Sequence, residues 1–138
     1  MITGFDRSRQ VLEVRSSSRD GRGLFATEPI PSETLLMEAP ILLVPDHQRP
    51  ALQDTVVDDY VYEWDESGTA ALVLGVSSMC NHDDDPNAFL WLVPAGSAGP
   101  VAQLFALRDI ASDEEITVSY RADAASEGDP LWFEVRSV

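Results

Sequence analysis

A short polar segment, Cys80–Asn87, separates two apolar runs, Ala70–Val76 and Phe89–Val93. Pro86 lacks a backbone N–H and holds the residue before it in an extended conformation. The Asn and Asp side chains of the segment bond readily to nearby backbone groups. We therefore expect two buried strands joined by a rigid polar connection that holds other backbone segments in place. From these residues alone, a loop that only ties itself together is the simpler interpretation.

The size and hydropathy of the chain favour one globular domain. Its 138 residues are close to the usual size of a single domain, and 44% of them are hydrophobic. No apolar run approaches the roughly 20 residues that a membrane helix needs. The first segment, Met1–Gln10, is polar and has no signal-peptide core. We expect a cytoplasmic protein that does not contact a membrane.

The chain has few residues with which to build a metal or redox site. Cys80 is the single cysteine, which excludes an internal disulfide and a cysteine-rich zinc cluster. The two histidines, His47 and His82, are far apart in sequence and lack metal-ligand spacing. We expect no metal ion.

The charge of the chain is strongly negative. Its 24 acidic and 9 basic residues give a net charge of −15, and every basic residue is an arginine. Direct binding to nucleic acid needs a basic surface and is therefore disfavoured. A basic protein partner is favoured electrostatically. The alternative, that acidity only serves solubility, fits the composition equally well.

The hydrophobic pattern indicates a β-rich α+β domain with short strands and at most one or two short helices. A helix is expected over Asp46–Asp59, where Leu52, Val56 and Tyr60 recur at a spacing of four. A Gly/Ser/Pro loop, Pro94–Pro100, is expected to close a hairpin. Leu35–Val44, broken by Glu38 and Pro40, is expected to form strands that meet at a kink. The other expected strands are Val11–Val14, Ala70–Val76, Phe89–Val93, Val101–Leu107 and Glu115–Ser119.

Three aromatic residues, Tyr60, Tyr62 and Trp64, alternate along one segment and would share a face if the segment is extended. Acidic residues surround them. An aromatic face with carboxylates at its edge suits a cationic peptide. An edge strand with a packed aromatic face and solvated acids is the alternative.

Three motifs together resemble the SET-domain family of protein lysine methyltransferases. Asn81-His82 followed by Pro86-Asn87 resembles the central signature of the family. Gly21–Ala26 resembles its N-terminal glycine motif, and Glu114–Tyr120 resembles its C-terminal acidic-to-tyrosine motif. The three occur in the family's order and span residues 11–121.

This resemblance implies a fold that periodicity alone does not reveal. The family has a β-clip fold of short sheets, in which the C-terminal motif threads under the loop of the central motif as a pseudoknot. The chain would be a single SET domain over residues 1–138, with a short tail over 122–138. It would be a minimal SET core, without the cysteine-rich zinc segments that often flank the core.

The resemblance also implies an activity, which is methyl transfer from S-adenosyl-L-methionine to a lysine ε-amine of a basic protein, such as a ribosomal or DNA-associated protein. It assigns Tyr120 as the catalytic residue. His82 as a general base is a less favoured alternative to a structural His82. The implied cofactor-binding residues are Arg22, Gly23, Leu24, Asn81, His82, Trp132 and Phe133. The implied substrate channel is lined by Tyr60, Tyr62, Trp64 and Tyr120.

At four positions the chain departs from the pattern of the family. Glu33 and Asp113 stand where the family has glycine, so the first of these turns is expected to differ in geometry. Asp83 and Asp84 replace a serine and a cysteine, and two buried carboxylates would be costly, so we expect them to be exposed or paired. These departures motivate the alternative function, a catalytically inactive SET-fold module that binds a protein partner.

Overall fold

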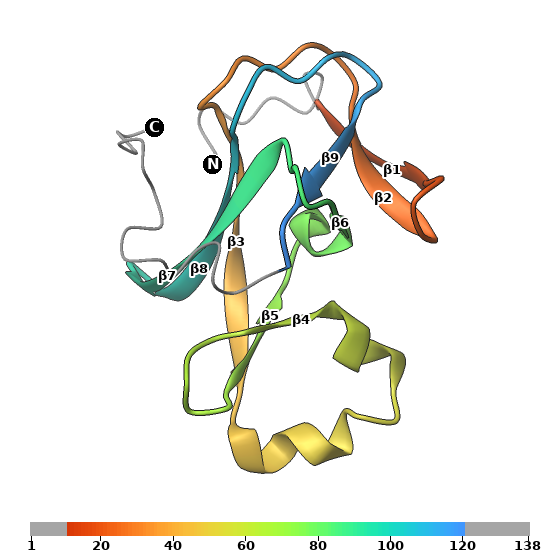
Figure 1. Cartoon of the computed structure of the whole chain (residues 1–138). Helices are drawn as coiled ribbons and strands as arrows, with labels where there is room; N and C mark the ends of the chain where they lie inside the picture. Colours follow the sequence, from red (N-terminus) through yellow and green to blue (C-terminus); the bar gives the residue numbers. More distant parts are fainter. Residues whose placement is uncertain (1–10, 121–138) are drawn as a thin grey trace.

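The computed structural model describes residues 11–120, which form two β-sheets and three 3₁₀ helices (Figure 1). The strands in the first sheet are ordered β1-β2-β9-β6, and those in the second β4-β5-β3-β8-β7. The strands are β1 (Leu12–Ser16), β2 (Arg22–Ala26), β3 (Leu35–Val44), β4 (Val61–Glu63), β5 (Ala70–Val73), β6 (Asn81–His82), β7 (Ala88–Gly96), β8 (Gly99–Ala106) and β9 (Glu115–Val118). The β-rich fold expected from the sequence is confirmed.

The last strand, β9, lies between two strands that come much earlier in the chain. It pairs with β2 in antiparallel fashion at Leu24 and Phe25. On its other edge it pairs in parallel with β6, where Asn81 faces Thr117 and His82 faces Val118. The C-terminal motif thus lies directly beside the central motif, as the expected pseudoknot requires.

The second sheet is organised on its longest strand, β3, which runs from the upper part of the molecule into the lower part (Figure 1). The β7–β8 hairpin is confirmed, but its strands extend to Gly96 and Gly99, which pair with each other. The connecting turn is therefore much shorter than the expected loop Pro94–Pro100. A register irregularity between Val93 and Gly96 accommodates the proline within β7.

The helix expected over Asp46–Asp59 is wrong. The structure has two 3₁₀ helices instead, η2 (Asp46–Ala51) and η3 (Val56–Tyr60). Pro50 lies inside η2, where it cannot donate a backbone hydrogen bond, and Thr55 is extended. A regular α-helix cannot pass through either residue in these states. A third 3₁₀ helix, η4 (Val76–Met79), precedes the central motif.

Two similar turns, 27–34 and 107–114, join the sheets and lie against each other. Each contains an isoleucine followed by serine and an acidic residue at the same spacing. The backbones of Ile30 and Ile110 exchange two hydrogen bonds of 2.8 Å each. Two further backbone bonds have matching positions, Glu33 N to Ala106 O and Asp113 N to Ala26 O, each 2.7 Å. The two turns are therefore related by an approximate two-fold arrangement.

The non-glycine residues at the family's two glycine positions keep a glycine-like backbone. Glu33 has φ +66° and Asp113 has φ +68°, both in the left-handed region. The expectation that the turn at Glu33 differs in geometry is therefore wrong. The hydrogen bonds between the two turns fix the backbone, and the side chains bear the steric cost of that conformation.

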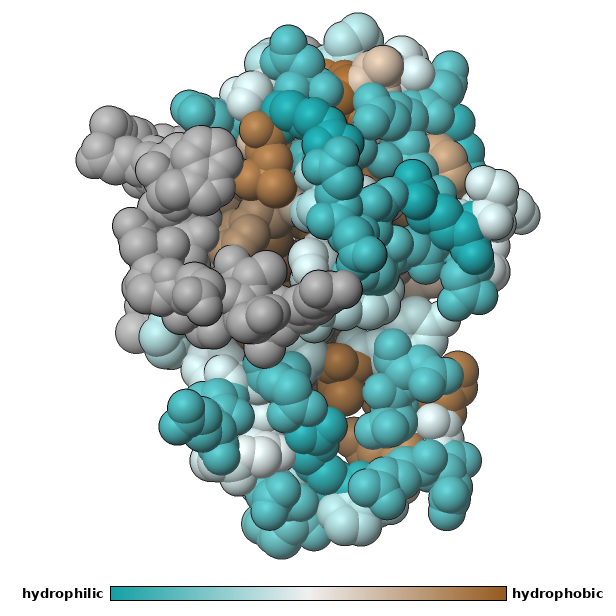
Figure 2. Space-filling view, viewed as in Figure 1, coloured by the Kyte–Doolittle hydropathy of each residue, from teal (hydrophilic) through white to brown (hydrophobic). Residues whose placement is uncertain are grey.

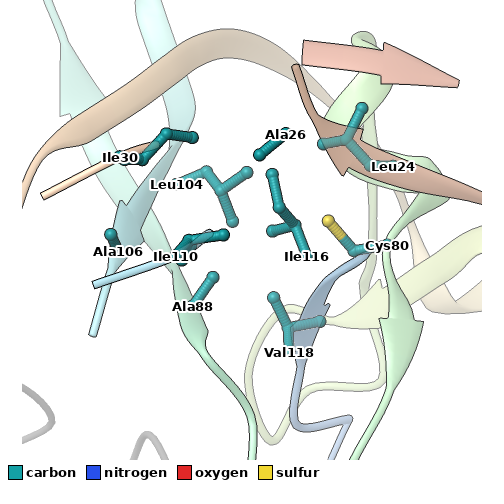
Figure 3. Close-up of a cluster of buried hydrophobic side chains, with 10 residues drawn as sticks. All are labelled: Leu24, Ala26, Ile30, Cys80, Ala88, Leu104, Ala106, Ile110, Ile116 and Val118. Atoms are coloured by element: carbon teal, nitrogen blue, oxygen red, sulfur yellow. The ribbon is translucent and has the colours of Figure 1, made fainter. Parts of the chain in front are cut away.

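The main hydrophobic core lies between the first sheet and the β7–β8 hairpin (Figure 3). Leu24, Leu104 and Ile116 have no exposed surface. The core contains the buried side chains Leu24, Ala26, Ile30, Cys80, Ala88, Leu104, Ala106, Ile110, Ile116 and Val118. Within residues 11–120, no helix is long and apolar enough to cross a membrane.

The left-handed backbone at Glu33 leads to a testable prediction. Glu33→Gly is expected to raise the free energy of unfolding by about 1 kcal/mol, because glycine adopts a positive φ without the steric cost of a side chain. Urea denaturation measures the change. Glu33→Gln is the matched control, because it removes the charge and keeps the strain, and it should leave the stability unchanged. An equal effect of both variants would assign the change to the charge and contradict the prediction.

Candidate active site

The glycine motif borders a small polar site at the end of β2. The pairing of β2 with β9 covers Leu24 and Phe25. At Arg22 and Gly23 this pairing has ended. The side chains of Asn81 and Glu115 lie beside the β2 backbone there, where a paired strand would otherwise be. A Cβ atom on Gly23 would overlap the Glu115 carboxylate and lie 3.1 Å from Asn81 Nδ2. Gly23 is therefore needed for the close approach of these two side chains to the backbone.

Asn81 connects the central motif to the glycine motif. Its Nδ2 donates to the backbone oxygens of Asp20 and Arg22, each at 3.1 Å, and to Glu115 Oε2 at 2.8 Å. Two carbonyls and a carboxylate thus hold the Asn81 amide by its nitrogen. The other end of the amide, Oδ1, is a hydrogen-bond acceptor and suits the cationic amino group of S-adenosylmethionine. The residues present fit the cofactor that the sequence predicts.

Glu115 belongs to the site, although the acidic-to-tyrosine motif alone assigns it no role. Its side chain is 8% exposed, and Ser17 Oγ donates to its two oxygens at 2.8 and 3.0 Å. Arg19 Nε lies 3.4 Å from Glu115 Oε1. One feature of the sequence points to Glu115: it is an acidic residue at the start of a short strand. The rest of that strand is apolar, apart from Thr117. Ser17 and Arg19 stand in an ordinary polar turn and gave no signal.

Tyr120 lies at the opposite side of the central motif. Its hydroxyl donates to the backbone oxygen of Cys80 at 2.7 Å, and its backbone N–H donates to His82 Nδ1 at 2.9 Å. The rings of Tyr62 and His82 pack against it, with centroid distances of 6.2 and 5.2 Å. These contacts fix the position of the phenol, while the residue as a whole remains 52% exposed. These contacts therefore hold the hydroxyl in one position.

The contacts of His82 define its role. Because Nδ1 accepts the Tyr120 backbone N–H, the ring proton resides on Nε2, which lies 2.8 Å from Asp84 Oδ1. Both ring nitrogens are thus engaged in positioning. This arrangement favours a structural His82 over a general base.

The environment of the phenols keeps them protonated. Burial raises the pKa of Tyr120, and the nearby Cys80, Asp20 and Tyr60 add to the effect. Burial also raises the pKa of Tyr62 far above its usual range. The Cys80 thiol has its pKa raised to about 12 by burial and by the charge of Glu115. Cys80 is therefore a buried neutral thiol and contributes its backbone oxygen to the site.

The three aromatic residues predicted for a substrate channel do not share one face of an extended segment. Tyr60 ends the 3₁₀ helix η3 and is 37% exposed, so the alternation from residue 60 to 64 is interrupted. Tyr62 lies in β4 and contacts the Tyr120 ring. Trp64 packs against the core of the second sheet. Tyr62 is thus placed beside Tyr120, and it packs against the same core as Trp64; the channel itself stays a prediction.

The acidic residues of the central loop are exposed or paired, as expected. Asp83 pairs with Arg19 at 2.7 Å and accepts the Asp85 backbone N–H at 2.8 Å, and its pKa is lowered chiefly by this backbone bond. Asp85 lies 3.4 Å from Arg108. Among residues 11–120, no three His, Cys, Asp or Glu side chains gather as metal ligands.

The structure brings most of the predicted cofactor residues together. Arg22 supplies a backbone oxygen, and the Leu24 side chain is fully buried in the core behind the motif. Asn81 and His82 form β6, next to β9. Two further predicted cofactor residues, Trp132 and Phe133, lie outside the described residues.

The close approach at Gly23 leads to a second prediction. Gly23→Ala is expected to weaken S-adenosylmethionine binding by about 10-fold or more, because the added methyl group displaces Glu115 from its charged hydrogen bonds. Calorimetric titration measures the affinity. Gly21→Asn is the control, because Gly21 has open space around its Cβ position and a φ of +47° that asparagine tolerates. The prediction fails if the two variants bind the cofactor equally well.

Two known enzymes are similar to this chain in sequence. The chain is 39% identical over 127 residues to a histone-lysine N-methyltransferase specific for H3 lysine-37 from Schizosaccharomyces pombe, covering 91% of this chain and 79% of the relative. It is 26% identical over 130 residues to an enzyme specific for H3 lysine-4 from Eremothecium gossypii, covering 88% of this chain and only 13% of the relative.

Solved structures show the same fold. A histone methyltransferase candidate from Plasmodium falciparum superposes with a TM-score of 0.67 at 25% identity, covering 83% of this chain and 96% of that chain. A Polycomb repressive complex 2 bound to S-adenosylmethionine superposes with a TM-score of 0.66 at 20% identity, over 83% of this chain and 15% of that one. The SET domain family model matches residues 21–121. With its motifs, its fold and this match in agreement, the chain belongs to the SET domain family.

Proposed function

We propose that this SET domain methylates a lysine in a histone-like protein. Its activity is that of a protein-lysine N-methyltransferase that uses S-adenosyl-L-methionine as the methyl donor. The observation that carries the assignment is the Tyr120 hydroxyl, held at 2.7 Å from the Cys80 backbone oxygen one residue before Asn81. The catalytic phenol and the cofactor-binding asparagine are thereby held on one short segment.

The chemistry requires alignment more than proton transfer. The cofactor supplies an electrophilic methyl group on a positively charged sulfur. Asn81 and the backbone at Arg22–Leu24 would hold the cofactor at one side of the central segment. Tyr120 at the other side would orient the incoming amine, because its own proton is donated to Cys80 and its oxygen lone pairs can accept. Positioning of this kind accounts for a large part of the rate in a linear displacement.

The proton of the lysine leaves by water rather than through a side chain. A free lysine amine has a pKa of about 10.4 and must become neutral before it attacks. Desolvation beside Tyr62 and Tyr120 lowers the pKa of an amine, because burial disfavours the charged form. Tyr120 is a poor proton acceptor, since its own raised pKa keeps it protonated. His82 is engaged at both ring nitrogens.

The surface supports a basic partner. The net charge is −15, and the view in Figure 2 is dominated by hydrophilic residues. The exposed acids Asp59, Asp65 and Glu66 and the partly exposed Asp58 lie in or near η3 and β4, the segment that contains Tyr60 and Tyr62. Two relatives act on histone H3, which extends the predicted basic substrate to a histone-like one. A ribosomal or other DNA-associated protein is the other basic target predicted from the sequence.

The four departures from the family pattern no longer support the alternative function, an inactive interaction module. Glu33 and Asp113 keep the left-handed backbone of the glycines they replace. Asp83 and Asp84 are paired with Arg19 and His82 at the surface. The departures from the family pattern are therefore accommodated without loss of the site.

Tyr120→Phe separates an enzyme from an interaction module. The variant removes the hydroxyl that bonds to Cys80 and is expected to lower kcat by about 100-fold or more, since an oriented polar group at the reacting centre is lost. Binding of S-adenosylmethionine should change little. Transfer of labelled methyl groups to core histones gives kcat, and calorimetry gives the affinity. Unchanged turnover in the variant would remove Tyr120 from the mechanism.

Mass spectrometry of the methylated products identifies the substrate. This chain contains no lysine, so every methyl-lysine found after the reaction comes from the added protein. Mass spectrometry of histone H3, ribosomal proteins and an acidic control protein, each incubated with enzyme and cofactor, locates the modified residue. We expect modification of H3 and none of the acidic protein. Modification of ribosomal proteins alone would replace the histone-like substrate with the ribosomal one.

The titration of the amine and of Tyr120 predicts the pH dependence. The neutral fraction of a lysine rises about tenfold per pH unit below its pKa. We therefore expect kcat/KM to rise from pH 7 to about pH 9, without a descending limb from Tyr120, because the raised pKa of Tyr120 keeps the phenol protonated throughout this range. Circular dichroism at each pH verifies the fold. A bell-shaped profile with its maximum near neutrality would argue against these protonation states.

The cytoplasm stays the predicted compartment. Imaging of the fluorescently tagged chain tests it, and concentration of the signal in another compartment would contradict it.

A further inference from the structure

Glu115 is a buried carboxylate whose donors within residues 11–120 come from the edge of the cofactor site. Its side chain is 8% exposed. Ser17 Oγ and Asn81 Nδ2 donate to it at 2.8 Å, and Arg19 Nε lies at 3.4 Å. A buried charge is costly unless hydrogen bonds and an opposite charge compensate it. Glu115 is compensated by the turn before the glycine motif and by the central motif together.

The carboxylate determines which way the Asn81 amide faces. The two ends of an amide differ in chemistry, because nitrogen only donates and oxygen only accepts. An ionised carboxylate only accepts, so it selects Nδ2, and the Asp20 and Arg22 carbonyls make the same selection at 3.1 Å. The Oδ1 atom lies in the same amide plane and consequently points away from the acceptors of Nδ2. Without Glu115, two neutral carbonyls would be left to hold the orientation.

The Arg19 guanidinium contacts both the Glu115 carboxylate and the central loop. Arg19 Nη1 donates to Asp83 Oδ2 at 2.7 Å, while its Nε lies near Glu115. Asp83 belongs to the loop that follows Asn81 and replaces a small residue of the family pattern. Two contacts thus join the turn over residues 17–21 to the central motif. One is the ion pair of Arg19 with Asp83, and the other is the hydrogen bond from Asn81 to the Asp20 backbone oxygen.

We propose that Glu115 is a positioning residue: it fixes the Asn81 amide so that Oδ1 is presented to S-adenosylmethionine as a hydrogen-bond acceptor. This role rests on the proposed function, because it concerns the same cofactor site. It explains why a costly carboxylate is kept at 8% exposure, and why Gly23 must lack a side chain beside it. Glu115 acts through Asn81 and does not itself touch the reacting atoms.

A double-mutant cycle on the full chain tests this role. Glu115→Gln keeps the size of the side chain and removes its charge, so its amide can present either end to Asn81. We expect it to weaken S-adenosylmethionine binding by about 10-fold or more, the effect of losing a hydrogen bond to a charged group. In an Asn81→Ser background, the same change should weaken binding by less than about 3-fold, because the partner through which it acts is absent. Calorimetric titration gives all four affinities.

A matched control separates position from net charge. Asp54→Asn removes one negative charge from an exposed residue outside the site and should leave the affinity unchanged. Denaturation curves measure the stability of each variant independently. If Glu115→Gln does not fold, Glu115→Asp serves in the same cycle, since it keeps the charge and draws the oxygens back by one methylene.

The outcomes distinguish a failure of the positioning role of Glu115 from a failure of the proposed function. Additive effects of the two substitutions on affinity would overturn the positioning role and leave Glu115 as a purely structural residue. Lower stability with unchanged affinity would overturn it equally. A well-folded native chain that binds no S-adenosylmethionine would overturn the proposed function, and the positioning role with it.

Discussion

The position of β9 depends on two asparagine side chains, one from each end of the central motif. Asn87 is 2% exposed; its Nδ2 donates to the Glu115 backbone oxygen at 2.8 Å, and its Oδ1 accepts the Thr117 backbone N–H at 2.9 Å. Asn81 bonds to the Glu115 carboxylate from the other end. A buried amide left without these partners would cost about 1–3 kcal/mol for each lost bond. The central segment therefore holds the strand that leads to Tyr120, and the catalytic geometry follows from this attachment.

Backbone geometry is retained in this chain even where residue identity is not. The paired turns exchange hydrogen bonds through Ile30 and Ile110, and this contact holds Glu33 and Asp113 at positive φ. Each side chain costs about 1–2 kcal/mol in that conformation, which is small against the several backbone bonds that would break if the turn changed. A sequence pattern that requires glycine here is thus stricter than the physical requirement, which is a left-handed backbone supported from both sides.

The sequence predicts well what depends on local pattern. Apolar runs bounded by turn formers locate β3 and the β7–β8 hairpin, and the three motifs identify the family. The helix over Asp46–Asp59 was wrong because a spacing of four is also compatible with two 3₁₀ helices once Pro50 interrupts the bonding. The insertion of β9 between β2 and β6 is a long-range pairing that no local pattern encodes. The repeat of isoleucine, serine and acid in the two turns is visible in the sequence, but its meaning appears only when Ile30 meets Ile110.

The buried carboxylate of Glu115 shows how stability and function separate at this site. Well-packed apolar residues often replace a buried ionic group with no loss of stability, so stability alone does not explain its retention. An apolar side chain at this position, however, would leave Asn81 Nδ2 with only the two backbone carbonyls and would give the amide no charged partner. The cofactor needs one defined end of that amide. An ion that is costly for folding is therefore useful for binding, because it converts a rotatable amide into an acceptor with a fixed direction.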